Sequence, residues 1–271
     1  MPTLINSYNF KDPDAQAFIN AAAISNVVQQ NAINQLVLSL KEKSLWTKFY
    51  VVYPFVGGTS SSHKFNLKNP ADTDAAFRIS FSAGWTHSSN GILPNGSAFA
   101  DTFLKPSVSF TNFSTHMSVY SRTTGINGST FSDIGVTHTA ATAYEPLITL
   151  RVRNANLAES YLYSYIAPNR AAFATNTDGK GFYIGNRTSN VINQIWKNGT
   201  KLATNTTTET LDTTVITKNC YLGALNLDGT ASQFATNELA FATLGTGLTD
   251  QNATDLSTII EVFQKALNRN V

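Results

Sequence analysis

The sequence predicts a mainly β protein, an antiparallel two-sheet sandwich with a helical segment at its N-terminus and one helix at its C-terminus. Two patterns support this fold class. Short segments of apolar or alternating composition follow one another from residue 49 onward, each bounded by Gly, Asn, Asp or Pro, as in antiparallel sandwiches. The pair Asn198-Gly199 lies between two of them and is typical of a tight hairpin turn. We expect strands at residues 49–56, 76–82, 97–101, 115–122, 147–153, 159–166, 180–186, 191–197, 213–223 and 237–244.

The first 45 residues predict a helical arm ahead of the sandwich. Residues 1–12 are expected to form an extended arm. Pro13 suits the first turn of a helix, and Ser25 is the expected N-cap of a second helix. Apolar residues recur on one face of this second helix, so that face needs the sandwich or a neighbouring protein as a partner. They are Ile33, Leu36, Val37 and Leu40. We divide the chain into this packing or docking arm, residues 1–45, and a sandwich with its C-terminal helix, residues 46–271.

Two strand patterns predict which side chains share a face. Residues 148–153 alternate strictly, so their Thr and Arg side chains should lie together on one solvated face. Tyr161, Tyr163 and Tyr165 also alternate and should share a face, either as one wall of the core or as an exposed platform. We favour the core.

The last element is predicted to be a helix that begins at Thr249 or Asp250. Lys265 and Arg269 lie in its final turns, where the helix dipole favours cations. Its apolar stripe consists of Leu256, Ile259, Ile260, Phe263 and Leu267.

The composition excludes several classes of function. Charged residues make up 13% of the chain, about half the usual share of roughly 25%, and the net charge is only +2 with scattered basic residues. Nucleic acid is therefore not expected as a partner. Cys220 is the only cysteine, so no intrachain disulfide can form. The N-terminal residues lack the pattern of a secretory signal, and no apolar run approaches the roughly 18 residues of a membrane span. We expect synthesis in a cytoplasm and no membrane insertion.

The segment from the hairpin IWKNGTKL through CYLGALNLDG to ATNELAFATLGTGLT and the final helix resembles the closing half of concanavalin A-like lectin/glucanase (laminin-G-like) jelly rolls. The resemblance covers roughly residues 180 to 267 and implies a jelly-roll topology for the sandwich.

A second resemblance covers the chain apart from its first dozen residues. The strings GGTSSSHKFNLKNP (residues 57–70), GWTHSS (84–89) and NGSAFADT (95–102) are similar to segments of virion proteins of tailed and related bacteriophages and of prophages. This resemblance implies a structural or host-contacting protein of the virion, in the head or the tail, with other virion proteins as partners and with a homo-oligomeric state. It does not imply a specific ligand.

Catalytic carboxylates are not predicted. Glucanases of the jelly-roll superfamily carry two acidic residues at alternate positions of one strand, which brings both carboxylates to one face. Among the 17 acidic residues only Asp12/Asp14 and Asp72/Asp74 lie two apart, and both pairs stand beside a proline. We expect Asp72 and Asp74 to orient the turn after Pro70, and the chain not to be an enzyme.

Metal and cofactor sites are not predicted either. No His, Cys or Asp cluster has the spacing of zinc ligands. Structural calcium could use loop carbonyls with Asp133 or Asp228, but no calcium-loop motif supports it. Of the four histidines, His116 is expected to be a hydrogen-bonded structural residue.

Glycan binding needs only an aromatic ring with amides and hydroxyls around it. The polar stretch 84–91, expected as a loop that leaves a strand, offers such groups. The predicted ligand-binding residues are Trp85, His87, Asn90 and Asn95. For Trp85 itself we favour a plug at the rim of the core over ligand contact.

Three hypotheses of function follow. The first is a non-enzymatic virion structural protein that contributes to host-surface glycan attachment. The second is a carbohydrate-binding module for host polysaccharide. The third is a polysaccharide depolymerase, which the missing carboxylate motif makes the least favoured.

Overall fold

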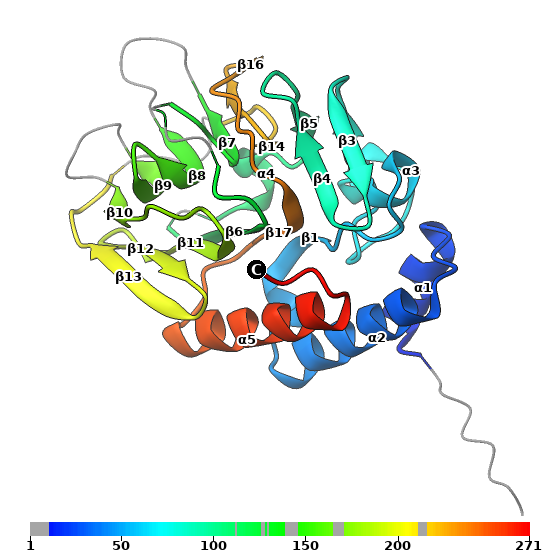
Figure 1. The fold of residues 1–271 in the computed structure, drawn as a ribbon. Coiled ribbons are helices and arrows are strands. Elements are labelled where there is room, and N and C mark those ends of the chain that lie inside the picture. Colours follow the sequence, from blue (N-terminus) through cyan, green and yellow to red (C-terminus); the bar gives the residue numbers. More distant parts are fainter. Residues whose placement is uncertain are drawn as a thin grey trace, which may run out of the picture.

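The computed structural model of the chain describes residues 11–111, 113–125, 128, 130–138, 146–164, 171–210 and 216–271. Two β-sheets pack face to face, and helices α2 (Val27–Glu42) and α5 (Asp250–Ala266) lie side by side across the outer face of one sheet (Figure 1). The mainly β sandwich with helices at both ends is therefore confirmed. Within the described ranges no helix has both the length and the apolar character that a bilayer span requires.

The strands of the first sheet pair antiparallel in the order β13-β12-β11-β6-β17-β4-β3, and β1 pairs with β17. The central strands β6 and β17 are buried along their whole lengths, because the second sheet covers one face and the helices cover the other. The bounds are β1 (Phe49–Tyr53), β3 (Trp85–Ser88), β4 (Gly91–Pro94), β6 (Thr115–Ser121), β11 (Gly181–Ser189), β12 (Ile192–Lys197), β13 (Thr200–Asn205) and β17 (Leu239–Gly245).

The second sheet has the order β10-β9-β8-β7-β14-β5-β2 and is antiparallel along this path. A short hairpin of β15 and β16 joins it through one parallel pairing of β15 with β7. The bounds are β2 (Ser80–Phe81), β5 (Ala100–Asp101), β7 (Ile134–Thr137), β8 (Leu147–Asn154), β9 (Leu157–Ser164), β10 (Ala172–Thr175), β14 (Tyr221–Leu222), β15 (Leu225–Leu227) and β16 (Thr230–Ser232).

Both faces of β8 are buried. Its alternating apolar residues lie in the core between the sheets, as predicted. Thr149 and Arg151 on its opposite face are buried as well, so the prediction of a solvated face is wrong. The Thr149 hydroxyl lies 2.6 Å from that of Ser132, and Arg151 donates to Glu159 at 3.1 Å and to Gln233 at 2.9 Å.

The two described tyrosines of β9 lie on opposite sides of the second sheet, so the predicted shared face is wrong. Tyr163 has a φ of 56° where the pairing with β8 shifts register, and this bulge turns its ring into the core between the sheets. Tyr161 packs in a small cluster on the other face. Both rings are buried, as expected. Tyr165 lies outside the described residues.

A second core lies between the first sheet and the helices. Helix α1 (Pro13–Ala21) and the apolar stripes of α2 and α5 share this core with Phe182, Trp196 and Phe241 of the sheet. The arm therefore packs on the sandwich itself. Thr249 caps α5 as predicted, but the N-cap of α2 is Asn26, whose side chain accepts from the Gln29 N–H, and not Ser25.

Several predicted strands are longer than the strands in the structure. Of residues 76–82 and 97–101 only β2 and β5 are strands. The first of these ranges begins late because the three-residue 3-10 helix Asp74–Ala76 ends at Phe77 in the left-handed region. The stretch 84–91, predicted as a loop, forms β3 and its turn to β4. In the range 213–223 the described strand is β14 alone. The short helices α3 (Ser60–His63) and α4 (Pro106–Ser109) and the 3-10 turn Trp46–Lys48 connect these strands.

Arg269 is buried past the end of α5, so its predicted place in the final turns of the helix is wrong. Its guanidinium is 1% exposed and donates to the carbonyls of Pro54 and Phe55 at 2.7 Å each and of Ala240 at 2.8 Å. Its Nε donates to Gln264 at 2.6 Å. Burial lowers the pKa of Arg269 to about 9, which still leaves it charged at neutral pH.

Replacing Arg269 should therefore destabilise the fold strongly. In Arg269→Met the three carbonyls lose their buried donors, and we expect the free energy of unfolding to fall by about 3 kcal/mol or more. Lys265→Met is the matched control, because Lys265 is exposed and only pairs with Glu261 on the same helix; its cost should stay below about 0.5 kcal/mol. Urea denaturation of the three proteins measures both values. Equal losses in the two variants would contradict the role of Arg269.

Candidate binding groove at the edge of the sandwich

The four predicted ligand-binding residues all lie on or beside the β3–β4 hairpin, but the structure brings only two of them together. Trp85 and His87 occupy alternate positions of β3 and share a face. Asn90 lies in the turn at the tip of the hairpin, whereas Asn95 follows β4 at its base, roughly 16 Å away along the strands. The Asn95 side chain holds its own turn by accepting from the N–H and O–H of Ser97.

Trp85 fills the rim of the core. Its indole N–H donates to the Phe99 carbonyl at 3.0 Å, and its ring packs against the core between the sheets. A Cβ built on Gly223 would lie 2.7 Å from the ring, so the glycine leaves room for it. The only donor of the indole is therefore used inside the protein, which agrees with the rim plug. A ligand contact of Trp85 stays a prediction.

His87 is held by a second histidine that the sequence did not single out. The Nδ1 atoms of His63 and His87 lie 3.0 Å apart, and the Gly58 N–H donates to Nε2 of His63 at 3.2 Å. His63 must therefore carry its proton on Nδ1 and donate it to His87, which leaves the proton of His87 on Nε2. Burial lowers the pKa of His63 to about 3 and also lowers the pKa of His87, so both rings are neutral at pH 7.

A chain of ring contacts runs from the core to this edge. It passes from Phe55 to His63 (5.9 Å between centroids), to His87 (5.2 Å), to Phe81 (4.6 Å) and to Trp85 (5.7 Å). Phe81 is the half-buried end of β2, the edge strand of the second sheet. Phe81 was not among the predicted ligand-binding residues, although it ends the alternating sequence of residues 77–81, just ahead of the stretch 84–91. The edges of both sheets therefore meet at Phe81.

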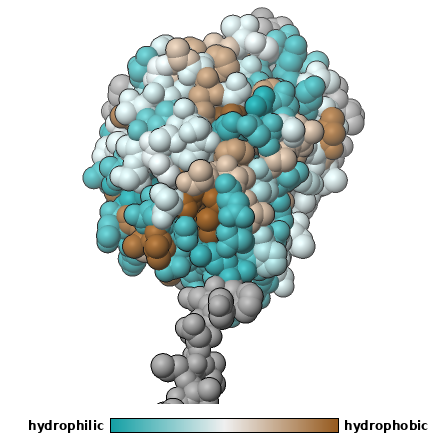
Figure 2. Space-filling view, turned by 90° about the vertical axis from the view of Figure 1, so that its right-hand side faces the viewer, coloured by the Kyte–Doolittle hydropathy of each residue, from teal (hydrophilic) through white to brown (hydrophobic). Residues whose placement is uncertain are grey.

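A hollow of about 340 Å³, which we call the serine groove, opens beside Phe81. α3 and the segment before β2 form its walls, which carry three hydroxyls and two cations. It is lined by Ser60, Ser61, Lys64, Arg78, Ile79, Ser80 and Phe81. Figure 2 shows the side of the molecule on which Figure 1 places α1, α3 and β3; this surface is mainly hydrophilic, with the hydrophobic colour in small separate patches.

The charges of the serine groove form one network with Asp72 and Asp74. Lys64 and Arg78 both bind Asp72, at 2.5 and 3.0 Å, and Arg78 also binds Asp74 at 2.9 Å. The hydrogen bonds from Lys64 and Arg78 lower the pKa of Asp72, so it stays ionised at neutral pH. Such a carboxylate cannot act as a general acid, and the two aspartates instead hold the cations in place.

Three residues discussed from the sequence, His116, Asp133 and Cys220, are buried in the structure. His116 is fully buried, with Nδ1 2.6 Å from the Thr246 carbonyl and Nε2 3.1 Å from the Thr243 hydroxyl, so its structural role is confirmed. The Asp133 carboxylate is buried and already accepts from Asn237 and from the Val152 N–H, which does not fit a calcium ligand. Within the described ranges no three His, Cys, Asp or Glu side chains group as metal ligands would. Cys220 is buried.

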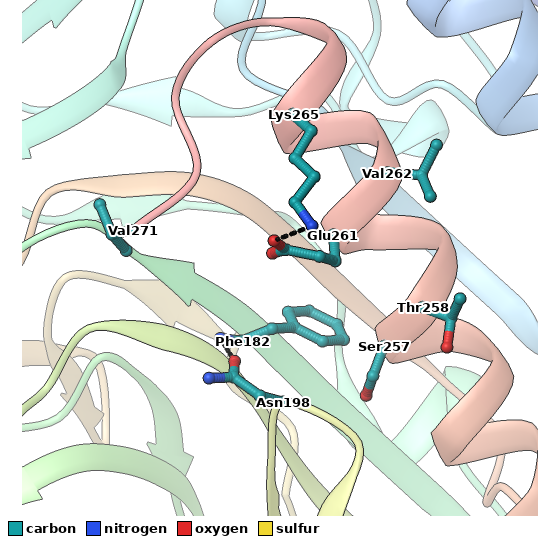
Figure 3. Close-up of a pocket in the computed structure, with 8 residues that line it drawn as sticks. All are labelled: Phe182, Asn198, Ser257, Thr258, Glu261, Val262, Lys265 and Val271. Carbon is teal, nitrogen blue, oxygen red and sulfur yellow. Dashed lines mark hydrogen bonds and ion pairs between the residues drawn. The ribbon is translucent and has the colours of Figure 1, made fainter.

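A hollow of about 400 Å³ lies between α5 and the first sheet (Figure 3). Phe182 forms part of its wall, and Glu261 and Lys265 pair with each other at 3.2 Å on the helix side. Its polar groups serve the fold: the Ser257 hydroxyl donates to the Ala253 carbonyl, and the Asn198 side chain accepts from the Phe182 N–H. We therefore assign this hollow to the junction of helix and sheet.

A scan against models of protein families finds no match, and neither does a search of curated proteins. Among solved structures, the fold is similar to domain 4 of AbnA, a GH43 extracellular arabinanase from Geobacillus stearothermophilus, solved in complex with arabinotriose. The TM-score is 0.51 at 13% identity, over 78% of this chain and 98% of that one. The CBM40 of the Ruminococcus gnavus IT-sialidase, bound to α2,3-sialyllactose, gives a TM-score of 0.43 at 14% identity, over 53% and 82% of the two chains. The likeness to domain 4 shows the sandwich fold.

The buried His63 predicts a specific acid sensitivity. Because its folded pKa of about 3 lies below its usual value of 6.5, the unfolded chain binds a proton that the folded protein does not between these pH values. Stability should therefore fall as the pH drops from about 6.5 toward 3. In His63→Gln this fall should be shallower than in the wild type, while the carboxylates contribute equally to both. Thermal unfolding at pH 7, 5.5 and 4.5 measures it, and parallel curves would refute the assignment.

Proposed function

We propose that this chain is a non-catalytic carbohydrate-binding domain and that the serine groove is its binding site. The observation that carries the proposal is the position of Phe81, a half-buried ring at the mouth of an open hollow, backed by His87 and Trp85 and bordered by fixed polar groups.

This arrangement suits the chemistry of a sugar ring. A sugar has an apolar C–H face, which packs on an aromatic side chain, and a rim of hydroxyls, which need both donors and acceptors. The serine groove offers Phe81 for the face, with Ser80, Lys64 and Arg78 for the rim. The ion pairs to Asp72 and Asp74 already hold the long cationic side chains in place. Less side-chain conformational entropy is therefore lost when a ligand binds.

The likeness to domain 4 of the arabinanase supports the same proposal at the level of the fold, since that domain was solved with a bound trisaccharide. A depolymerase is disfavoured because Asp72 and Asp74, the acidic residues beside the groove, are ion-paired to Lys64 and Arg78.

Placement in a virion remains a proposal that rests on the sequence strings at residues 57–70 and 84–89, with other virion proteins as partners and a homo-oligomeric state. In that setting the domain would attach the particle to host-surface glycan. The predicted docking through the arm has less support, because the apolar stripe of α2 is already packed against the sandwich.

Removing the ring of Phe81 should weaken binding without unfolding the protein. We expect Phe81→Ala to weaken the affinity for any glycan found on an array about tenfold or more. Phe173→Ala is the matched control, since Phe173 is 45% exposed on β10, at the opposite edge of the second sheet. Isothermal titration calorimetry measures both variants. Equal weakening in the two, or an unchanged affinity in Phe81→Ala, would contradict the proposed site.

A further inference from the structure

A third hollow, of about 380 Å³, opens next to the serine groove, and we call it the phenylalanine hollow. Its lining includes two aromatic rings, Phe77 and Phe103, together with Lys105, Asn219 and the side chain of Asp74. Like the serine groove it offers half-buried rings beside polar groups, but the sequence patterns did not point to it.

Both phenylalanines are held in a strained backbone conformation. Phe77 has a φ of 58° and Phe103 a φ of 57°, in the left-handed region that bulky residues rarely occupy. The surrounding structure enforces it: the Tyr53 hydroxyl donates to the Phe77 carbonyl at 2.6 Å, and the Phe103 N–H donates to Asp101 at 2.8 Å. The left-handed conformation fixes the direction in which each ring leaves the backbone.

Asn219 lies in the wall of the hollow. Its Nδ2 donates to Asp101 at 3.0 Å, and Asp101 also accepts from the Phe103 N–H. The Asp101 carboxylate therefore joins Asn219 to the backbone of Phe103.

The two hollows share one wall. Asp74 lines the phenylalanine hollow and Arg78 lines the serine groove, and their side chains meet at 2.9 Å. A ligand that passes over this ion pair would contact Phe81 on one side and Phe103 on the other.

We propose that the phenylalanine hollow is a second sugar subsite, and that one neutral oligosaccharide spans both hollows across the Arg78–Asp74 pair. This inference rests on the proposed function of the serine groove and adds the length and the charge class of the ligand.

The charge class follows from the network between the hollows. Lys64 and Arg78 are each already paired with Asp72 or Asp74, so these two positive charges are compensated. Lys105 shares the phenylalanine hollow with Asp74 and lies close enough to Asp101 to act on its charge. The carboxylate of an acidic sugar would have to compete with both aspartates for these cations and would be repelled by them. Neutral hydroxyls can instead donate to the aspartates and accept from the remaining N–H groups of Arg78.

Phe103 offers a variant that removes the subsite but keeps the fold. Phe103→Gly deletes the ring and places a glycine where φ is positive, so the relief of backbone strain offsets part of the lost packing. Phe103 belongs to none of the hydrophobic core clusters, and the variant should keep the fold. Phe113→Gly is the matched control, because Phe113 also has a positive φ, of 59°, and does not line either hollow.

The experiment measures the affinities of the full chain for neutral arabino-, xylo-, cello- and malto-oligosaccharides of increasing length by calorimetry, with oligogalacturonates as the acidic series. In the wild type and in Phe113→Gly the affinity should rise about tenfold from the disaccharide to the longest member of the bound series. In Phe103→Gly this gain should shrink to about twofold or less, with the disaccharide affinity unchanged.

The outcomes separate the two proposals. Binding that does not increase with length, or a gain that survives in Phe103→Gly, would overturn the second subsite and leave the serine groove standing. Preference for oligogalacturonates would overturn the neutral class. If neither the neutral nor the acidic series bound, the proposed function would fall and the subsite with it.

Discussion

The buried guanidinium of Arg269 joins the parts of the fold that meet behind the serine groove. It binds the end of β1 through Pro54 and Phe55, and it binds β17 through Ala240. Phe55 has a φ of 41°, and its ring begins the row of aromatic contacts that ends at Phe81. Because one cation satisfies several carbonyls in a dry environment, it fixes their relative positions more firmly than apolar packing would. The proposed binding surface therefore depends on a residue that never reaches it.

The helices also determine where a ligand can bind. The first sheet is covered by the second sheet on one face and by α2 and α5 on the other, so neither face of its central strands is open to a sugar. The serine groove and the phenylalanine hollow instead lie around β2, at the edge of the second sheet. There, loops with half-buried rings replace the flat face of a sheet.

Local patterns predicted much of the fold and little of the site. The apolar run of β1, the Asn-Gly hairpin and the stripe of α5 each specify one element from neighbouring residues. The partner of His87 lies 24 positions away in the chain, and the carbonyl of Phe55 that Arg269 binds lies 214 positions away, so no local pattern shows either contact. The same limit explains the tyrosines of β9. Tyr161 and Tyr163 stand at alternate positions, which in a regular strand would place them on one face, but a bulge set by the tertiary structure turns one ring to the other face.

The pairing of β1 with β17, together with the contact from Arg269 to Phe55, has a consequence for how the chain acquires its structure. During synthesis, the helices α1 and α2 and the strand β1 emerge from the ribosome long before α5 and Arg269 have been made. Strand β1, which pairs with β17, and the part of α2 that contacts α5 therefore remain uncovered until β17 and α5 have been made. Contacts of such high sequence separation slow folding and leave unpaired strands exposed to association. The contacts behind the serine groove can thus form only after α5 and Arg269 have been synthesised.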